Sequence, residues 1–597
     1  MIRRQIPAIF LLFVLLAPYT TFGQQPAQQT QGQSAQQPTV DPNDPIERIK
    51  KEGMEHSQVM QTLSYLSDVI GPRLTASPNM KRACEYTRDQ LAKWGLQNAH
   101  LEAWGPFGRG WSLKRFSAQV VEPQDIPLIA YPKAWSPGTN GPLTAEVVYF
   151  DAKNDSDFEK FKGQLQGKIV LTAPMREVKA HFEALGTRRD DRNLLGLADA
   201  PEPRAGRGGF GRNNADFRAA QIFNNKKYQF FQDEVAALLI DPSRAGDGGT
   251  IFVQSATVPQ PLSADQAQTG QPGPGGSRPV QPYDKNARIT PQLVLAVEHY
   301  NRIVRMLQAG EKVKLEVNLA VEYQDADRMG YNTIAEIPGS DLKDEIVMLG
   351  GHMDSWHSGT GATDNGAGVA AAMEAVRVLQ TLGLKPRRTI RIALWTGEEQ
   401  GLLGSRAYVA EHFGRLETPA TAVATAATPV AGDRIASTSR PPRDGSDSAN
   451  SSPTPVLIKK PEYEKLAGYF NLDNGTGRIR GVYLQGNEAV RPTFRQWLMA
   501  FRDRPEDKNA TVWAATTLSI TDTRGTDHLS FDAIGLPGFQ FIQDEIEYDT
   551  RTHHSNQDVF DRIQGDDMKQ AATIMAAFVY NTAMRDEKLP RKPLAAR

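Results

Sequence analysis

The chain has 597 residues, of which 40% are hydrophobic and 23% are charged, and its formal net charge is -1. This length exceeds what one simple core needs, so we expect two or more domains. The balanced charge gives no reason to expect nucleic acid or an anionic membrane surface as a partner. After the first 17 residues no apolar run approaches the ~20 residues of a spanning helix, so we expect no transmembrane segment in the mature chain.

The N-terminus has the pattern of an export signal. Arg3 and Arg4 precede an apolar run at residues 6–17, and small residues suitable for cleavage follow. We therefore predict a secretory signal peptide over residues 1–23 and a secreted or periplasmic protein. The alternative is an uncleaved anchor, although the run is short for a membrane span. Residues 24–44, rich in Gln, Pro and Ala, are predicted to form a disordered linker.

Cys84 is the only cysteine, which excludes an intramolecular disulfide and a structural zinc site of the cysteine type. It lies in a predicted helix, and we expect it to be a small buried apolar residue.

The first half of the chain changes character near residue 140. Residues 45–98 show helical spacing of apolar side chains, so we assign residues 45–139 to the first part of the main domain. Residues 140–325 contain short β-rich runs. One of them, residues 313–321, alternates apolar and polar side chains with the period of a half-buried strand. We interpret residues 140–325 as an inserted β-rich domain.

Residues 326–590 alternate strand and helix patterns, which predicts an α/β fold with a mainly parallel, mixed sheet flanked by helices. The segment 418–455, rich in Ala, Thr, Ser and Pro, interrupts this pattern and is predicted to be a low-complexity insertion.

Acidic and imidazole side chains follow the predicted strands of this region, each just beyond the strand's C-terminal end. Because these ends meet at one edge of an open α/β sheet, we expect one site there. The candidates are His352 and Asp354 after strand 345–349, Glu398 and Glu399 after strand 389–395, Asp473 after strand 466–472, and His553 and His554 after strand 539–542.

These residue types suit a two-metal hydrolytic centre with nitrogen and oxygen ligands. We expect the Asp354 carboxylate to accept a proton from the ring nitrogen of His352 that does not bind metal. Of the neighbours Glu398 and Glu399, one can bind metal while the other acts as base. Taken singly, Asp364 or Asp473 before Asn-Gly would be an ordinary turn, but turns alone do not explain why all candidates follow strands.

Five short segments make the chain similar to the di-zinc aminopeptidase and glutamate carboxypeptidase family, most of all to its carboxypeptidase Q branch. The resemblance covers nearly everything after the linker, and the inserted domain matches the position of that branch's protease-associated domain. The segments are Gly350–Ser355, Asp364–Gly368, Gly397–Gly401, Asn471–Asp473 and His554–Asp558.

The resemblance implies a secreted di-zinc metallo-exopeptidase acting on short peptides, with two Zn²⁺ per chain and a possible homodimer. Glu398 would be the general base that takes a proton from a metal-activated water, and Asp354 would support His352. The Asp364-Asn365 peptide bond would be cis. The implied zinc ligands are His352, Asp364 as the bridge, Asp473, Glu399, and His554 in preference to His553.

Several alternatives stay open. His553 could stabilise an oxyanion or pack, His357 could form a pocket wall or an extra metal contact, and the loop 525–528 is expected to touch substrate or support the ligands. The rival functions are a non-peptidase zinc hydrolase or cyclising acyltransferase, and a non-catalytic receptor or binding module. The sequence does not decide between aminopeptidase, carboxypeptidase and dipeptidase activity.

Overall fold

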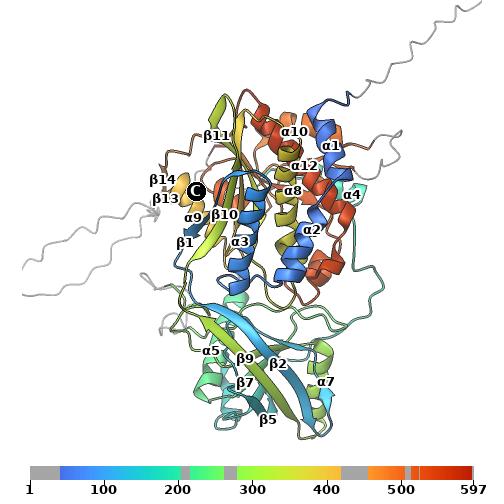
Figure 1. Ribbon diagram of the computed structural model, residues 1–597. Coiled ribbons are helices and arrows are strands. Elements are labelled where there is room, and N and C mark those ends of the chain that lie inside the picture. Colours follow the sequence, from blue (N-terminus) through green and yellow to red (C-terminus); the bar gives the residue numbers. More distant parts are fainter. Residues whose placement is uncertain are drawn as a thin grey trace, which may run out of the picture.

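The structure is a computed structural model that describes residues 41–203, 215–260, 278–417, 455–503, 513–523 and 525–593. The predicted signal peptide, all but residues 41–44 of the predicted linker, and all but residue 455 of the predicted insertion lie outside the described residues. Within them, two eight-stranded sheets organise the chain (Figure 1).

The first sheet is mixed, with a parallel centre. Its four central strands, β12, β11, β15 and β18, run parallel, whereas β10 pairs antiparallel with β1 and β12, and β16 pairs antiparallel with β18 and parallel with β17. This confirms the expected mixed α/β fold. In spatial order the strands are β1 (Gln97–Trp104), β10 (Gly330–Ile337), β12 (Arg388–Trp395), β11 (Leu342–His352), β15 (Leu466–Asn471), β18 (Gly538–Gln543), β16 (Ile479–Tyr483) and β17 (Thr517–Ser519).

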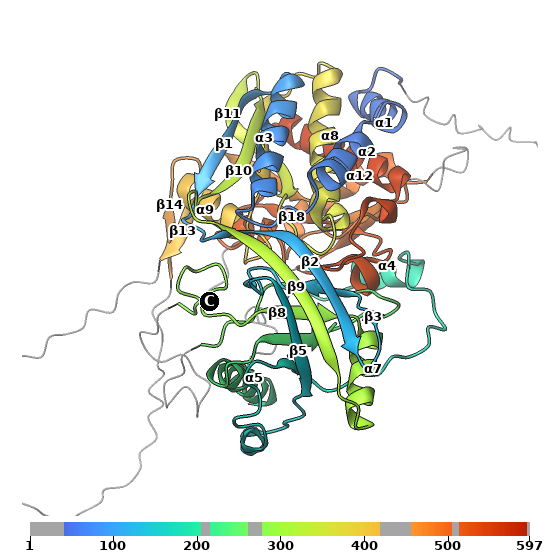
Figure 2. The same ribbon diagram turned by 60° about the horizontal axis from the view of Figure 1, so that its bottom comes forward.

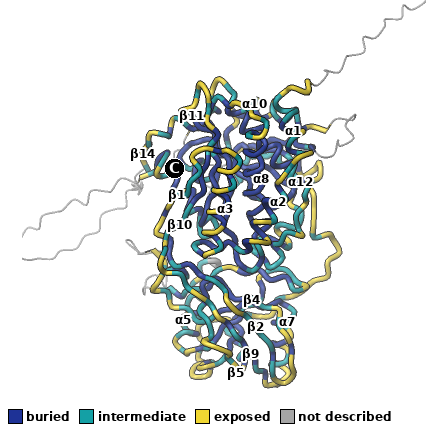
Figure 3. The backbone as a smooth tube through the Cα atoms, viewed as in Figure 1, coloured by how far each residue is buried: buried dark blue, intermediate teal, exposed yellow. Residues whose placement is uncertain are grey.

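Helices cover both faces of this sheet, which is why its central strands are continuously apolar. Successive side chains of β11 point to opposite faces. Val347 and Leu349 join the core beneath α8 (Ala367–Thr381) and α12 (Gly565–Met584), whereas Ile346 and Met348 join the core beneath α9 (Leu403–His412) and α11 (His528–Asp532). Figure 3 shows the buried backbone gathered around α8.

The larger helical layer lies on the α8 side of the first sheet (Figure 1). It contains α1 (Pro45–Glu55), α2 (Val59–Ser64), α3 (Pro78–Lys93), α8 (Ala367–Thr381) and α12 (Gly565–Met584). The opposite face carries α9 (Leu403–His412) and α11 (His528–Asp532). The remaining helices are α4 (Asp191–Ala198), α5 (Ala215–Asp233), α7 (Val297–Gln308) and α10 (Arg491–Leu498).

The second sheet, with α5 and α7, forms a separate body that Figure 2 shows below the first. We call it the second module. In β9, Leu315, Val317 and Leu319 are buried while the residues between them are partly exposed, which confirms the predicted alternating strand. Its strands are β3 (Ile126–Pro127), β2 (Gly110–Glu122), β9 (Lys314–Gln324), β5 (Pro142–Tyr149), β6 (Ile169–Leu171), β7 (Leu238–Pro242), β8 (Gln292–Leu295) and β4 (Ala130–Pro132).

The chain enters the second module between β1 and β2 and returns between β9 and β10. The two connections lie side by side, because the Arg109 guanidinium pairs with Asp325 at 2.8 Å and Phe107 N–H donates to Arg328 O at 2.8 Å. The second sheet therefore begins at Gly110, ahead of residue 140, where the sequence placed the start of the insertion. Two β-bulges in β2 had hidden its period from the sequence pattern. The assignment to a protease-associated domain stays a prediction.

Two further features concern the chain as a whole. Strands β13 (Gly414–Glu417) and β14 (Val456–Lys459) pair antiparallel, so the predicted insertion starts and ends beside one two-stranded ribbon. None of the helices within the described residues combines the length and apolar character needed to cross a bilayer.

Candidate metal centre

The structure brings the predicted ligands together at the C-terminal edge of the first sheet. His352 ends β11, Glu399 follows β12, Asp473 follows β15, and His554 lies in the loop after β18. Asp364 lies in the turn that precedes α8. Parallel central strands place all these loops on one edge, as the sequence pattern predicted.

Asp364 occupies the middle of the group. Its Oδ1 lies 3.4 Å from Nε2 of His352, and its Oδ2 lies 3.2 Å from Nε2 of His554. Asp473 Oδ1 is 3.3 Å from His352 Nε2, and Glu399 Oε2 is 3.0 Å from His554 Nε2. Two clusters therefore share one carboxylate, each with an imidazole and a second carboxylate.

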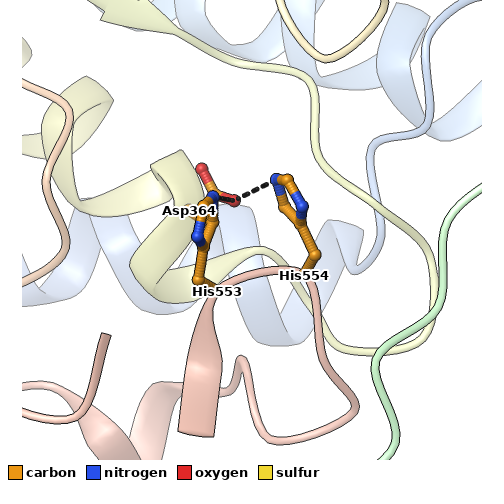
Figure 4. A group of neighbouring side chains, drawn as sticks. All are labelled: Asp364, His553 and His554. Carbon is orange, nitrogen blue, oxygen red and sulfur yellow. Dashed lines mark ion pairs between the residues drawn. The ribbon is translucent and has the colours of Figure 1, made fainter. Parts of the chain in front are cut away.

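His553 is the neighbouring imidazole, and it stands further from the group. Its Nε2 lies 3.8 Å from Asp364 Oδ2, and its ring stacks on Tyr548 with centroids 4.5 Å apart. Figure 4 shows the imidazoles of His553 and His554 next to each other, both close to the Asp364 carboxylate, and their ring centroids lie 3.9 Å apart. Only His554 also reaches Glu399 among the ion pairs of the described residues. This geometry favours His554 as the ligand.

The turn that carries Asp364 is fixed by its neighbour Asn365. The Asp364-Asn365 peptide bond is cis, as the resemblance implied. The Asn365 side chain donates to Leu472 O at 2.9 Å and accepts from Gly368 N–H at 3.0 Å. The turn is thereby tied to the end of β15, next to Asp473.

Comparison with known proteins identifies the catalytic region. The profile of peptidase family M28 matches residues 332–440 and 445–579. Over this region the chain is similar to the peptidases of family M28. Carboxypeptidase Q of Mus musculus is 24% identical over 542 residues, which cover 90% of this chain and 88% of the relative. Carboxypeptidase Q of Bos taurus is 25% identical over the same shares.

A solved structure agrees at the level of the fold. The peptidase M28 precursor from Shewanella amazonensis SB2B superimposes with a TM-score of 0.58 at 21% identity, and the match covers 92% of this chain and 98% of that one. Together the comparisons confirm the family resemblance carried by the five segments and the expected class of enzyme, a metallopeptidase.

The donor set of this site fits divalent metal ions. Asp364 Oδ2, Glu399 Oε1 and Asp473 Oδ1 are buried and accept no hydrogen bond from the described residues. Buried carboxylate oxygens without donors are costly, and a cation would satisfy them. His352, Asp364 and Asp473 each place a ligand atom within 4.8 Å of the others. Oxygen and imidazole donors in this arrangement suit zinc.

The buried carboxylates and imidazoles of the site shift one another's pKa values. Burial would lower the pKa of His352, but the carboxylates of Asp473 and Glu398 raise it well above its ordinary value. Burial raises the pKa of Glu399 to about 7 against the opposing effect of His554. Burial also lowers the pKa of His554, but Glu399 and Asp364 outweigh it and raise the value to about 10. Bound cations would replace the protons that this cluster holds.

Asp354 plays a different part from the one expected. Nδ1 of His352 lies 3.0 Å from the main-chain oxygen of Asp354 and 3.7 Å from its carboxylate, so the main-chain oxygen accepts the ring proton. The prediction that the carboxylate does so is wrong, because the oxygen two residues along the backbone is closer. The carboxylate instead accepts the N–H groups of Glu398 and Glu399, each at 3.2 Å, and the Thr75 hydroxyl at 2.9 Å. It thus orients the turn that carries both glutamates.

Two other histidine-containing segments lie nearby without joining the ligand groups. His357 turns toward the second module, where Nε2–H donates to Pro132 O at 2.8 Å and the ring packs against Trp111. His357 is buried at this contact, and its role as a pocket wall stays a prediction. In the loop 525–528, Asp527 is fully buried, and burial raises its pKa to about 7. His528 is buried beside it.

No motif in the sequence marks the residues that hold the ligand loops. The guanidinium of Arg73, which is fully buried, donates to Met353 O at 2.8 Å, Thr360 O at 2.8 Å and Gly361 O at 2.6 Å. These carbonyls belong to the loop between His352 and Asp364. A lone arginine almost 280 residues upstream carries no motif, so only the fold reveals this contact.

Proposed function

We propose that this protein is a di-zinc exopeptidase that hydrolyses short peptides, with Glu398 as general base. The observation that carries the proposal is the shared carboxylate of Asp364, whose two oxygens face His352 and His554 at 3.4 and 3.2 Å. A carboxylate between two imidazole-containing clusters is the arrangement that two metal ions at one site require.

The ligands divide into two sets around that bridge. His352 and Asp473 would hold one zinc ion, and Glu399 and His554 the other. Bound zinc would polarise the peptide carbonyl and lower the pKa of a water molecule toward neutrality. The chain's own contribution is to orient these donors in a buried site, since His352, Asp364 and Asp473 are each less than a tenth exposed.

Glu398 is placed to move the proton. Its Oε2 lies 3.9 Å from Nε2 of His352, and its N–H is held by Asp354. Burial raises the pKa of Glu398 well above its ordinary value, and the carboxylates of Asp473 and Asp527 add to this effect. A carboxyl group with a raised pKa can accept a proton from water and return it to the leaving amine.

The cavity between the two modules supports a small substrate. It has a volume of about 380 Å³, within the range of small-molecule sites. Asp549, which lines it, lies 3.9 Å from His553, the neighbour of His554 in the chain, but none of the proposed ligands lines the cavity. Its walls contain cationic side chains such as Arg551, which suit a peptide carboxylate, and anionic ones such as Asp247, which suit an ammonium group. Aminopeptidase and carboxypeptidase activity therefore both stay open.

The proposal is tested by replacing the base without disturbing the ligands. Glu398→Gln should retain two zinc ions and lose about 10²–10⁴-fold in kcat, the usual contribution of general base catalysis. Glu411→Gln, an exposed change on α9, is the matched control and should behave as wild type. Zinc content by atomic absorption and turnover of unblocked dipeptides are the two measurements. Turnover by Glu398→Gln at the wild-type rate would exclude this base.

The bridge is tested separately. Asp364→Asn should lose metal on dialysis, because one carboxylate serves both sets of ligands. Full retention of both ions would contradict the bridging role. Dipeptides blocked at either terminus, assayed with and without a chelator, distinguish aminopeptidase from carboxypeptidase activity. A metal-loaded protein that cleaves none of them would instead point to another hydrolase.

Export of the chain rests on the pattern of residues 1–23, and the homodimer rests on the family resemblance. Both are part of the proposal. N-terminal sequencing of the protein recovered outside the cytoplasm tests the first, and sedimentation tests the second.

A further inference from the structure

One short segment of the second module runs along the chain at His554. Residues 249–256 run beside the loop that carries His554, and Phe252 and Ser555 form an antiparallel bridge. Val253 N–H donates to His554 O at 3.0 Å, and Asn556 N–H donates to Ile251 O at 3.0 Å. We call residues 249–256 the docking segment.

Side-chain contacts strengthen this pairing. The Asn556 side chain accepts from Ile251 N–H at 2.8 Å and donates to Gly249 O at 3.1 Å. The docking segment is in turn held by its own module, because Ala134 N–H donates to Gln254 O at 3.0 Å and Ala256 N–H donates to Ala134 O at 2.9 Å. Gln254 is thus fixed along its backbone between the second sheet and the His554 loop.

The side chain of Gln254 reaches the imidazole itself. Its amide nitrogen Nε2 lies 3.1 Å from Nδ1 of His554, while Nε2 of the imidazole ring faces Asp364 and Glu399. A neutral histidine that binds metal through Nε2 carries its proton on Nδ1, and that proton needs an acceptor. Turning the side-chain amide of Gln254 by 180° exchanges its nitrogen and its oxygen, which are nearly the same in shape. The amide oxygen then faces Nδ1 and accepts this proton.

We infer that Gln254 is a positioning residue for the metal centre. Its side-chain carbonyl accepts the Nδ1–H of His554 and so fixes the tautomer and ring orientation in which Nε2 points to the zinc. This inference rests on the proposed function, because it takes His554 as a zinc ligand. The second module then contributes to metal affinity although it provides no ligand of its own.

The other ligand loop meets the same module. His357 lies between His352 and Asp364 in the chain, and its Nε2–H donates to Pro132 O. Trp356 packs against Trp135 with ring centroids 6.3 Å apart and against His554 at 6.0 Å. The second module therefore supports both loops that carry imidazole ligands, and the contact of Gln254 is the one directed at a ligand side chain.

The test compares two substitutions of Gln254 that differ in their ability to accept a hydrogen bond. Gln254→Met keeps the length and removes the acceptor, whereas Gln254→Glu keeps an acceptor in every orientation. Gln254 is exposed, so neither change disturbs a packed core. The matched control is Gln229→Met on α5, an exposed glutamine of the same module that donates only to Asp233.

Zinc affinity is measured by competition with a chromogenic chelator on the full-length protein, alongside the melting temperature of the metal-free form. We expect Gln254→Met to weaken zinc binding about tenfold, at the low end for such partners because water can reach this exposed position. Gln254→Glu should bind zinc at least as tightly as wild type. The comparison is made at high salt, where the added charge is screened. The metal-free melting temperature should not change.

The outcomes separate the two proposals. Suppose that the wild-type protein binds two zinc ions. If Gln254→Met and Gln254→Glu then weaken zinc affinity equally, or if neither weakens it, Gln254 is not a positioning residue. If the wild-type protein binds no zinc, the proposed function itself fails. If it binds zinc but cleaves no peptide, the proposed activity fails, and the affinities of the Gln254 variants still decide the role of this residue.

Discussion

Arg73 gives the sharpest test of how the ligand loops are held. Its guanidinium is fully buried and donates to five carbonyl oxygens, those of Met353, Thr360, Gly361, Leu66 and Gly71. Burial lowers the pKa of Arg73 to about 10, so the group stays charged at neutral pH. Replacing Arg73 by Met keeps much of the aliphatic volume and removes every donor.

The magnitude follows from the carbonyls that lose their donor. Two of the five, Leu66 O and Gly361 O, also accept a backbone N–H, so five minus two leaves three that depend most on Arg73. A buried polar group left unsatisfied costs about 1–3 kcal/mol, so Arg73→Met should cost about 3–9 kcal/mol. This is a large part of the ~5–15 kcal/mol that stabilises a typical protein. Arg73→Lys restores one or two hydrogen bonds and should lie in between.

Thermal unfolding with a zinc assay measures the effect. We expect Arg73→Met to lower the apparent Tm by at least about 5 °C and to release zinc during dialysis, because the loop it holds joins His352 to Asp364. Arg406→Met, an exposed arginine on α9, is the control and should leave both unchanged. If Arg73→Met melts within about 2 °C of wild type and keeps its zinc, the guanidinium does not hold the loop.

The other two predictions concern a buried imidazole and a buried thiol. Burial lowers the pKa of His357 from 6.5 to about 4, so the stability that its neutral ring provides is complete above about pH 6.5 and is lost as the pH falls toward 4. When the pH falls from 7.5 to 4.5, the free energy of unfolding measured in urea should therefore decrease by about 2–3 kcal/mol more for wild type than for His357→Gln. Equal decreases in the two proteins would contradict this. Burial also raises the pKa of Cys84 to about 12, so a thiol reagent at pH 8 should label it only after unfolding; rapid labelling of the native protein would show that the thiol is accessible.

The fold could be predicted wherever one face or both faces of an element are buried along its whole length. In β11 every residue from Ile346 to Leu349 is buried, and in β9 every second residue from Leu315 to Leu319 is buried. Both patterns are visible in the sequence. In β2 the register shifts between Leu113 and Arg115. The alternation of apolar and polar residues is therefore interrupted between Trp111 and Phe116. The sequence pattern therefore does not predict this thirteen-residue strand, and it places the start of the inserted domain at residue 140, after β2.

The clustering of the candidate ligands could be predicted because metal chemistry demands particular side chains next to strand ends, and these side chains come in short local motifs. The contacts that hold them follow no such rule. Asp354 was recognised, but its carboxylate accepts the N–H groups of Glu398 and Glu399, which only the relative position of two strands could reveal. Gln254 meets His554 across 300 residues of sequence. Tertiary contacts of single polar residues leave no periodic trace.

The proposed ligands are held from two directions, and this has an energetic consequence. Arg73 fixes the loop before Asp364 from inside the first body, while the docking segment fixes the His554 loop from the second module. Neither contact supplies a donor to the metal. Both limit the positions from which Nε2 of His352 and Nε2 of His554 can face the Asp364 carboxylate. A centre ordered before the metal arrives does not spend binding free energy on ordering loops. Zinc would bind the ordered loops more tightly than disordered ones, so its binding must also stabilise the ordered state and with it the contact between the two modules.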